Sequence, residues 1–224
     1  YALPRIREAG KRAFVLVNHP RTRMLRDDLE AIVGTQLDGV LLPHATEPQD
    51  VRDLAVLLRE FEYTRGVEPG TVAAYPVIAT ATGLLRAAEI ARAAPRVGGL
   101  VFDGSGYAAD VGGRPEERGE RFAYARAAVV AAARAAGGLP LVDASPLELV
   151  TMAQYGFAGA VLSDPRSAGT ANAAFAPKQH EIERAREQVR AYDAARAEGA
   201  WVARYGNGIV DAATARRARQ VLSE

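Results

Sequence analysis

Apolar residues in this chain follow two alternating patterns. Short runs of consecutive apolar residues, many of them β-branched, are separated by longer amphipathic stretches. Uniformly apolar short runs are typical of strands in a parallel sheet, and the amphipathic stretches are typical of helices that cover it. The predicted strands are Phe14–Val17, Gly39–Leu42, Pro76–Ile78, Leu100–Phe102, Leu139–Val142 and Ala160–Leu162.

The amphipathic stretches predict the helices that connect these strands. A strand follows a helix about every 25–35 residues, which is the spacing of repeated strand–helix units in a parallel α/β fold. No low-complexity linker interrupts the alternation, so a single parallel sheet or barrel is the simplest interpretation. The predicted helices are Arg21–Gly34, Pro48–Arg65, Gly83–Ala94, Glu117–Ala136, Leu147–Tyr155 and Pro177–Glu198.

The end of the chain departs from this rhythm. The residues after position 198 predict a hairpin that turns at Gly206–Asn207–Gly208, followed by a short helix capped near Asp211. We therefore expect a barrel domain over residues 1–198 and a C-terminal extension over residues 199–224.

Composition excludes several classes of partner. Lys and Arg number 28 against 27 Asp and Glu, a net charge of +1, which argues against a nucleic-acid-binding protein. Cys is absent, so disulfides and thiolate chemistry are excluded, and a cytoplasmic location is expected. No apolar run approaches the roughly 20 residues that a membrane-spanning helix needs, so no membrane partner is expected.

Candidate site residues lie where the predicted strands end. The active sites of parallel α/β folds form at the C-terminal ends of the strands. The residues at these ends are small and polar, and they are typical of the rim of a pocket. The candidates for substrate binding are Asn18, His44, Thr80, Asp103, Ser105 and Asp143.

Each candidate also has a structural interpretation. A lone histidine such as His44 more often solvates a loop or bonds a carbonyl group, and Asp143 and Asp164 fit helix N-caps. For Asp103, an Asx-turn is as probable as a ligand role. The Gly104–Ser105–Gly106 turn is not a dinucleotide-binding motif, because the third glycine of G-x-G-x-x-G is missing.

Several stretches together resemble one family. These are "DGVLLP", "YAADVG", "ARAAVVAAARAAG", "NAAFAP" and the closing "GNGIVDAATARRAR". The chain resembles the citrate lyase beta subunit and its relatives in the HpcH/HpaI aldolase and malyl-CoA lyase superfamily. The resemblance implies a TIM-type (β/α)8 barrel with a C-terminal segment, assembled as a homotrimer. It also implies reversible C–C cleavage of a 3-hydroxyacyl thioester, with a magnesium ion held by two carboxylates.

The chain departs from this family at the positions that the resemblance assigns to the metal. In "IATATG" Ala79 stands in place of the metal-binding glutamate, and in "FDGSGYAADVG" Gly106 stands in place of the metal-binding aspartate. We therefore expect no magnesium and no other cofactor. Asp103 offers one replacement oxygen, but the alternation of side chains along a strand predicts that it points elsewhere. If Gly106 has a positive φ, an aspartate there would be strained. Further departures are Leu16 for an arginine, His44 for a lysine, Ser105 for a glutamate and Asp164 for a histidine.

The predicted strands also fall short of the family's barrel. Six strands are predicted, and the resemblance implies that the first two strands of the barrel precede the given sequence. Two functions remain open. The chain is either a diverged C–C lyase that acts on an acyl-CoA or a keto acid, or a non-catalytic homologue that binds a ligand or partner subunit. In either case a homo-oligomer is expected.

Overall fold

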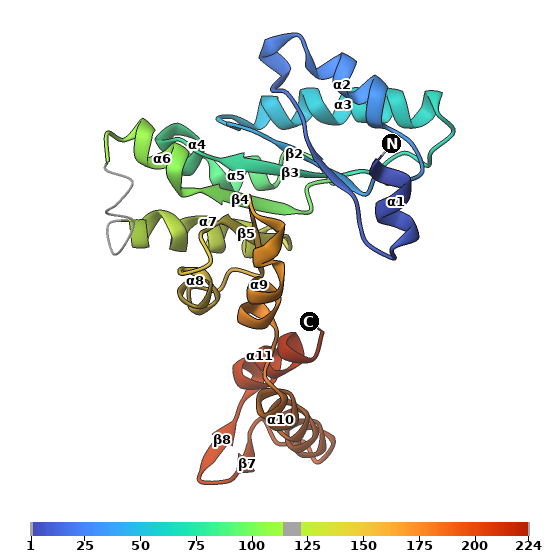
Figure 1. The fold of residues 1–224 in the computed structure, drawn as a ribbon. Coiled ribbons are helices and arrows are strands. Elements are labelled where there is room, and N and C mark those ends of the chain that lie inside the picture. Colours follow the sequence, from blue (N-terminus) through green and yellow to red (C-terminus); the bar gives the residue numbers. More distant parts are fainter. Residues whose placement is uncertain (1, 114–121, 224) are drawn as a thin grey trace. The chain divides into compact units, whose positions relative to one another are not determined.

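A computed structural model describes residues 2–113 and 122–223 of the chain. The chain divides into two compact units, Tyr1–Ala174 and Phe175–Glu224. The elements of each unit are shown in Figure 1.

The first unit is built on a six-stranded parallel sheet whose strands are adjacent in chain order. This confirms the predicted parallel arrangement, and each predicted strand overlaps an observed one. The sheet curls into a half-barrel (Figure 1). The strands are β1 (Phe14–Leu16), β2 (Gly39–Leu42), β3 (Ala73–Ile78), β4 (Gly99–Asp103), β5 (Leu139–Asp143) and β6 (Gly159–Val161).

The helices follow the predicted order with a few differences. The predicted helix from residue 83 is two short helices that meet at Arg86, and the one from residue 21 begins as a 3₁₀ turn. Three short helices, α1, α6 and α9, are not among those that the amphipathic stretches predict. Residues 117–121 of the predicted helix Glu117–Ala136 lie outside the described residues. The elements of the first unit are α1 (Ala2–Glu8), η1 (Pro20–Thr22), α2 (Leu25–Ile32), α3 (Pro48–Thr64), α4 (Ala81–Leu85), α5 (Ala87–Ala91), α6 (Gly104–Asp110), α7 (Ala123–Ala135), α8 (Leu149–Tyr155), η4 (Pro165–Ser167) and α9 (Ala168–Phe175), the last of which ends just past the boundary between the units.

One face of the sheet is covered by helices. Helices α3, α5 and α7 pack against the central strands. Because side chains alternate along a strand, every second residue points toward these helices. Those side chains are fully buried and form the core, which includes Val40, Leu42, Ile78, Leu100 and Phe102.

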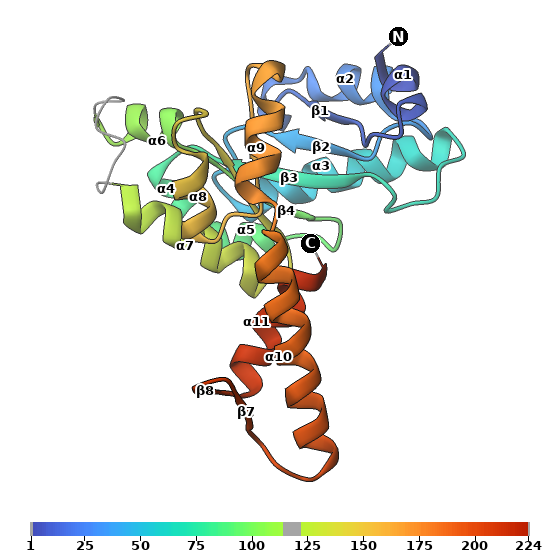
Figure 2. The same ribbon diagram turned by 60° about the horizontal axis from the view of Figure 1, so that its bottom comes forward.

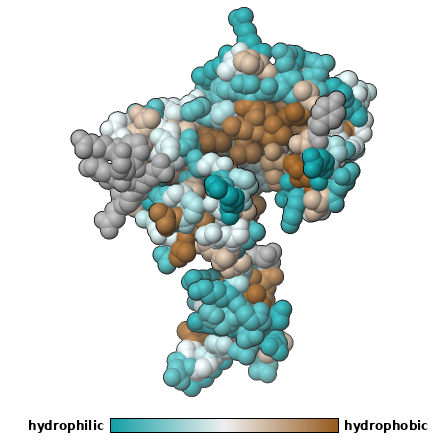
Figure 3. Space-filling model, viewed as in Figure 1, coloured by the Kyte–Doolittle hydropathy of each residue, from teal (hydrophilic) through white to brown (hydrophobic). Residues whose placement is uncertain are grey.

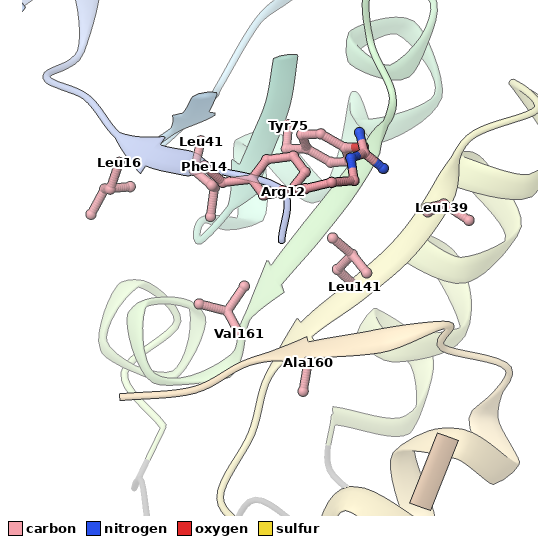
Figure 4. Close-up of a pocket in the computed structure, with 9 residues that line it drawn as sticks. All are labelled: Arg12, Phe14, Leu16, Leu41, Tyr75, Leu139, Leu141, Ala160 and Val161. Carbon is pink, nitrogen blue, oxygen red and sulfur yellow. The ribbon is translucent and has the colours of Figure 1, made fainter. Parts of the chain in front are cut away.

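The opposite face is also apolar, and it is exposed at β1. Strand register places Leu16, Leu41 and Tyr75 in one row across this face. Leu16 is 64% exposed, and Figure 3 shows apolar surface gathered over this part of the sheet. The face lines a cavity of about 500 Å³, in which the ring of Phe14 meets that of Tyr75 edge-on (Figure 4). Both faces being apolar explains why the strands appear as uninterrupted apolar runs.

A buried ion pair lies at the end of the sheet where strands begin. Glu62 on α3 and Arg96, which precedes β4, form two hydrogen bonds of 2.8 and 3.0 Å. The Glu62 carboxylate also accepts the backbone N–H groups of Gly70 and Val72. Burial raises the pKa of the Glu62 carboxyl, but these four hydrogen bonds lower it further, so its pKa lies below the ordinary value.

The second unit is a long helix that packs against a hairpin and a final helix. Its elements are α10 (Gln179–Ala197), β7 (Ala203–Tyr205), β8 (Gly208–Val210) and α11 (Ala212–Ser223). The predicted hairpin and the cap at Asp211 are confirmed, since Asp211 accepts the N–H of Thr214 at 2.8 Å. The turn needs a glycine at position 206, where φ is +54°.

Tyr192 on α10 explains why the unit begins before the hairpin. It packs with Ala203, Val210 and Ala215 in one small core, and α10 lies beside α11 (Figure 2). The compact units therefore meet between residues 174 and 175, whereas the sequence pattern placed a boundary after residue 198. Trp201, which lies between α10 and β7, is 72% exposed, and the guanidinium of Arg196 stacks 3.9 Å from its ring centre.

None of the helices in the described part of the chain is long and apolar enough to cross a membrane.

Candidate functional site

The C-terminal ends of β3, β4 and β5 bring three of the sequence positions singled out above together. Asp103 and Asp143 end neighbouring strands and are paired in register. Ala79 follows Ile78, whose register partner is Phe102, so Ala79 lies next to Asp103. Ala79 is buried at this point, and Asp143 is exposed.

The two oxygens of Asp103 have different surroundings. Oδ1 accepts the backbone N–H groups of Ser105 and Gly106, both at 2.9 Å, and so caps helix α6. Two otherwise unpaired helical N–H groups are satisfied in this way. The structural interpretation of Asp103 is therefore confirmed for Oδ1. The cap also explains α6, since a carboxylate at residue 103 pins the small residues that follow it into a helical turn.

Oδ2 of Asp103 points toward Gly106. A Cβ atom placed on Gly106 would lie 2.6 Å from Oδ2 and 2.9 Å from Cβ of Ala79. The expectation that Asp103 points away from this position is wrong, because the capping bonds turn its side chain over the first turn of α6. Gly106 lies within α6 and has no positive φ, so the concern about backbone strain there does not apply.

Thr80, a further candidate, holds local structure just after β3. The Thr80 hydroxyl caps α4 by accepting the N–H of Gly83 at 3.0 Å. Gly83 must lack a side chain, because a Cβ there would lie 2.4 Å from the carbonyl oxygen of Ala45. The N–H of Ala81 donates to Asp110 at 2.7 Å, which ties the start of α4 to the end of α6.

The remaining candidates lie at the same edge. Asn18 donates its side-chain amide to Asp28 at 2.8 Å, and His44 is exposed with a positive φ of 48°. Ser105 and Asp143 are exposed. Asp164 ends no strand but caps η4 by accepting the N–H of Arg166 at 3.0 Å. A substrate-binding role for any of these residues stays a prediction.

The structure also brings together a charged cluster that sequence reasoning did not find. His19 and Arg21 lie at η1 after β1, Glu47 and Asp50 lie at the start of α3, and Arg86 lies between α4 and α5. Arg21 bonds both Glu47 and Asp50, Arg86 pairs with Glu47 at 3.5 Å, and Nε2 of His19 lies 3.5 Å from Asp50. Burial raises the pKa of the Asp50 carboxyl, but the N–H groups of Thr46 and Glu47 and the nearby His19 lower it further, so its pKa lies below the ordinary value. Arg21 and Arg86 are too far apart in sequence for spacing to reveal the cluster.

The described residues do not fit a magnesium site of the kind the resemblance implies. Magnesium takes an octahedral set of oxygen ligands, at least one or two of them carboxylates. Ala79 and Gly106 carry no side-chain oxygen, and the described part of the chain holds no group of three or more His, Cys, Asp or Glu side chains suited to a metal. Whether the chain takes up magnesium stays a prediction.

Six parallel strands in a curled half-barrel sheet, with small and polar residues at the strand ends, define an α/β protein. The model of one family, HpcH/HpaI aldolase/citrate lyase, matches residues 2–162. The chain belongs to this family.

Comparison with individual proteins supports the same assignment. The chain is 33% identical to citrate lyase subunit beta of Escherichia coli (strain K12) over 206 residues, which are 88% of this chain and 68% of that protein. It is 31% identical to a (3S)-malyl-CoA thioesterase of Cereibacter sphaeroides (strain ATCC 17023) over 94% of this chain and 73% of that protein. The crystal structure of a citrate lyase from Burkholderia xenovorans LB400 shares the fold, with a TM-score of 0.78 at 21% identity over 93% of this chain and 70% of that one.

Proposed function

We propose that this protein cleaves a C–C bond in a 3-hydroxyacyl thioester or a related keto acid. Membership of the family across residues 2–162 carries this proposal. Two similar proteins are a citrate lyase subunit and an enzyme named for (3S)-malyl-CoA, which is itself a 3-hydroxyacyl thioester. The polar residues at the ends of β3, β4 and β5 offer acceptors for such a substrate.

The reaction sets clear demands on the site. A base takes the proton of the 3-hydroxyl group, and the O–H electron pair becomes part of the new C=O bond. The C2–C3 bond breaks, and its electron pair passes to the thioester as an enolate, which then takes a proton at C2. The products are a carbonyl compound and a shorter acyl thioester. The site must therefore hold the hydroxyl group and stabilise the enolate oxygen.

We further propose that the reaction proceeds without a magnesium ion on the two positions that the resemblance assigns to it. Ala79 and Gly106 offer no side-chain oxygen there. The same observation favours a second candidate function, a non-catalytic homologue that binds an acyl-CoA, a keto acid or a partner subunit on the retained scaffold.

The unpaired edges of β1 and β6 support a proposal about the complete fold. Unpaired edges beside an apolar face are unstable in a parallel sheet. We propose that two further strands close this sheet into an eight-stranded barrel, that the protein assembles as a homotrimer and that it resides in the cytoplasm.

The test is direct incubation of the protein with (3S)-malyl-CoA and, separately, with a 4-hydroxy-2-keto acid, with and without EDTA. Chromatography measures release of a shorter acyl-CoA or keto-acid fragment. We expect cleavage that EDTA does not change. Cleavage abolished by EDTA contradicts the metal-free part of the proposal. Binding of malyl-CoA without cleavage favours the non-catalytic function, and neither binding nor cleavage of either compound contradicts both.

A further inference from the structure

The turn after β1 is capped by a histidine. Nδ1 of His19 accepts the backbone N–H of Arg21 at 3.3 Å and so caps η1. Hydroxyl and carboxylate oxygens remain acceptors between pH 5 and 8, whereas histidine changes its charge in this range. Such oxygens form the other side-chain caps described above, those of Thr80, Asp103, Asp164 and Asp211. Among these caps, that of η1 is the one that a proton can remove near neutral pH.

The other ring nitrogen of His19 determines where that proton enters. Because Nδ1 accepts a hydrogen bond, the hydrogen of the neutral ring is on Nε2. Nε2 is fully buried, makes no hydrogen bond within the described residues and lies 3.5 Å from Oδ2 of Asp50. A second proton therefore enters at Nδ1. It turns the acceptor of the cap into a donor that faces the N–H of Arg21.

Asp50 then faces two cations. Its Oδ1 already accepts the guanidinium of Arg21 at 3.1 Å, and its Oδ2 accepts the backbone N–H groups of Thr46 and Glu47. The side chains of Asp50 and His19 are 3% and 14% exposed, whereas that of Arg21 is 61% exposed. The guanidinium can therefore move into water, and the buried ring cannot.

The elements packed around η1 supply the other charged groups near this ring. Helix α3 contributes Glu47, which pairs with Arg21, and α2 contributes Asp28, which accepts the backbone N–H and the side-chain amide of Asn18. Arg86, from the junction of α4 and α5, pairs with Glu47 at 3.5 Å. A positive charge on the ring therefore has carboxylates to pair with, and the group that it displaces from Asp50 is another cation.

We propose that His19 is a proton-sensitive switch at the end of β1. When Nδ1 takes up a proton between pH 8 and pH 5, the cap of η1 is lost and Asp50 exchanges the Arg21 guanidinium for the charged ring. Since Arg21 links the turn after β1 to the start of α3, acid loosens the first of the loops at the strand ends. This proposal does not depend on the proposed function.

The first test follows the backbone N–H of Arg21 by NMR on the full chain. Its exchange with solvent, corrected for the intrinsic effect of pH, should be about fivefold or more faster at pH 5 than at pH 8, the factor expected for losing a hydrogen bond. His19→Asn keeps a capping oxygen that does not titrate, and the difference should fall below about twofold. His44→Asn is the matched control, since His44 is an exposed histidine of the neighbouring loop and asparagine tolerates its positive φ. It should keep the full difference.

The second test needs no variant. Crystal structures of the wild-type protein at pH 8 and pH 5 should show Arg21 on Asp50 at the higher pH and away from it at the lower, with Nε2 of His19 beside Asp50 in both. An Arg21 N–H whose corrected exchange is the same at both pH values overturns the switch, as does a pH response that persists in His19→Asn or disappears in His44→Asn. A guanidinium that stays on Asp50 at pH 5 overturns the exchange of partners.

Discussion

Two carboxylates at opposite ends of the sheet illustrate two uses of the same chemical group. Glu62, at the end where strands begin, is fully buried and accepts four hydrogen bonds, two from Arg96 and two from the backbone. Asp103, at the end where strands finish, is half-buried and uses one oxygen for a helix cap. A carboxylate whose acceptors are all taken can only stabilise the fold. Asp103 keeps a second oxygen that no donor among the described residues reaches.

The largest loss of stability should come from breaking the buried ion pair between Glu62 and Arg96. Glu62→Gln leaves the Arg96 guanidinium buried with an uncompensated charge, and losing one partner of a buried pair costs about 3–5 kcal/mol. Urea unfolding followed by far-UV circular dichroism measures the free energy of unfolding. Glu60→Gln is the matched control on the same helix, because Glu60 and Arg26 form an exposed pair that contributes little to stability. Equal losses in the two variants would contradict the contrast between the pairs.

The same carboxylate should make stability depend on acid. The pKa of Glu62 lies below its ordinary value of 4.5 in the folded protein. Its contribution is therefore fully present above the pKa of the unfolded chain and is lost as the pH falls through the lower pKa of the folded state. Asp50, whose pKa is also lowered, acts with the same sign. Unfolding free energies measured from pH 7 down to pH 3 should decrease below about pH 4.5, and less steeply in Glu62→Gln.

At the end of the sheet where the strands finish, stability should depend more on close packing of the backbone than on charge. Gly83→Ala places a Cβ 2.4 Å from the carbonyl oxygen of Ala45, and overpacking of this kind costs about 1–3 kcal/mol. Gly169→Ala is the control, since nothing lies within 4 Å of a Cβ at that helical glycine. The control should be neutral or slightly stabilising. A Gly83→Ala variant as stable as the wild type would show that α4 and the loop after β2 can separate at little cost.

Asp103→Ser should change stability less than Glu62→Gln or Gly83→Ala. Serine is a good N-cap residue, so the loss should stay within about 1 kcal/mol. The same unfolding measurement checks it, with Asp211→Ser for comparison. A loss as large as that of Glu62→Gln would place Asp103 among the structural carboxylates and weaken the contrast between the two ends.

Magnesium should not bind measurably where β3 and β4 end. Calorimetric titration with magnesium and manganese should show no saturable site at millimolar concentrations, because Ala79 and Gly106 offer no charged oxygen. The double variant Ala79→Glu with Gly106→Asp should gain measurable affinity, although Asp103 must move to admit the new side chain. A stoichiometric isotherm with the wild-type protein would overturn this prediction.

Much of the fold was predictable because its signal is local. The apolar runs predict all six strands, and "YGNGIVDAATARRAR" predicts the hairpin, its turn and the cap at Asp211. Helix α6 was missed because its seven residues, GSGYAAD, include two glycines near the start and are too few to show an amphipathic period. The rotation of Asp103 over Gly106 was missed as well, since alternation along a strand no longer applies at its last residue. The pairs Glu62–Arg96 and Arg21–Asp50 depend on contacts between distant elements, which no sequence spacing reveals.

The stacked Trp201 has a practical consequence for following the folding of this protein. It is the single tryptophan of the chain and lies in the second unit, against Arg196. Tryptophan fluorescence therefore monitors the neighbourhood of α10 and the hairpin, and the parallel sheet contains no such reporter. A thermal scan recorded by this signal alone would give the melting of one unit and could miss that of the other. Tyr75→Trp together with Trp201→Phe would place the single tryptophan in the sheet, so that its fluorescence would follow the unfolding of the first unit.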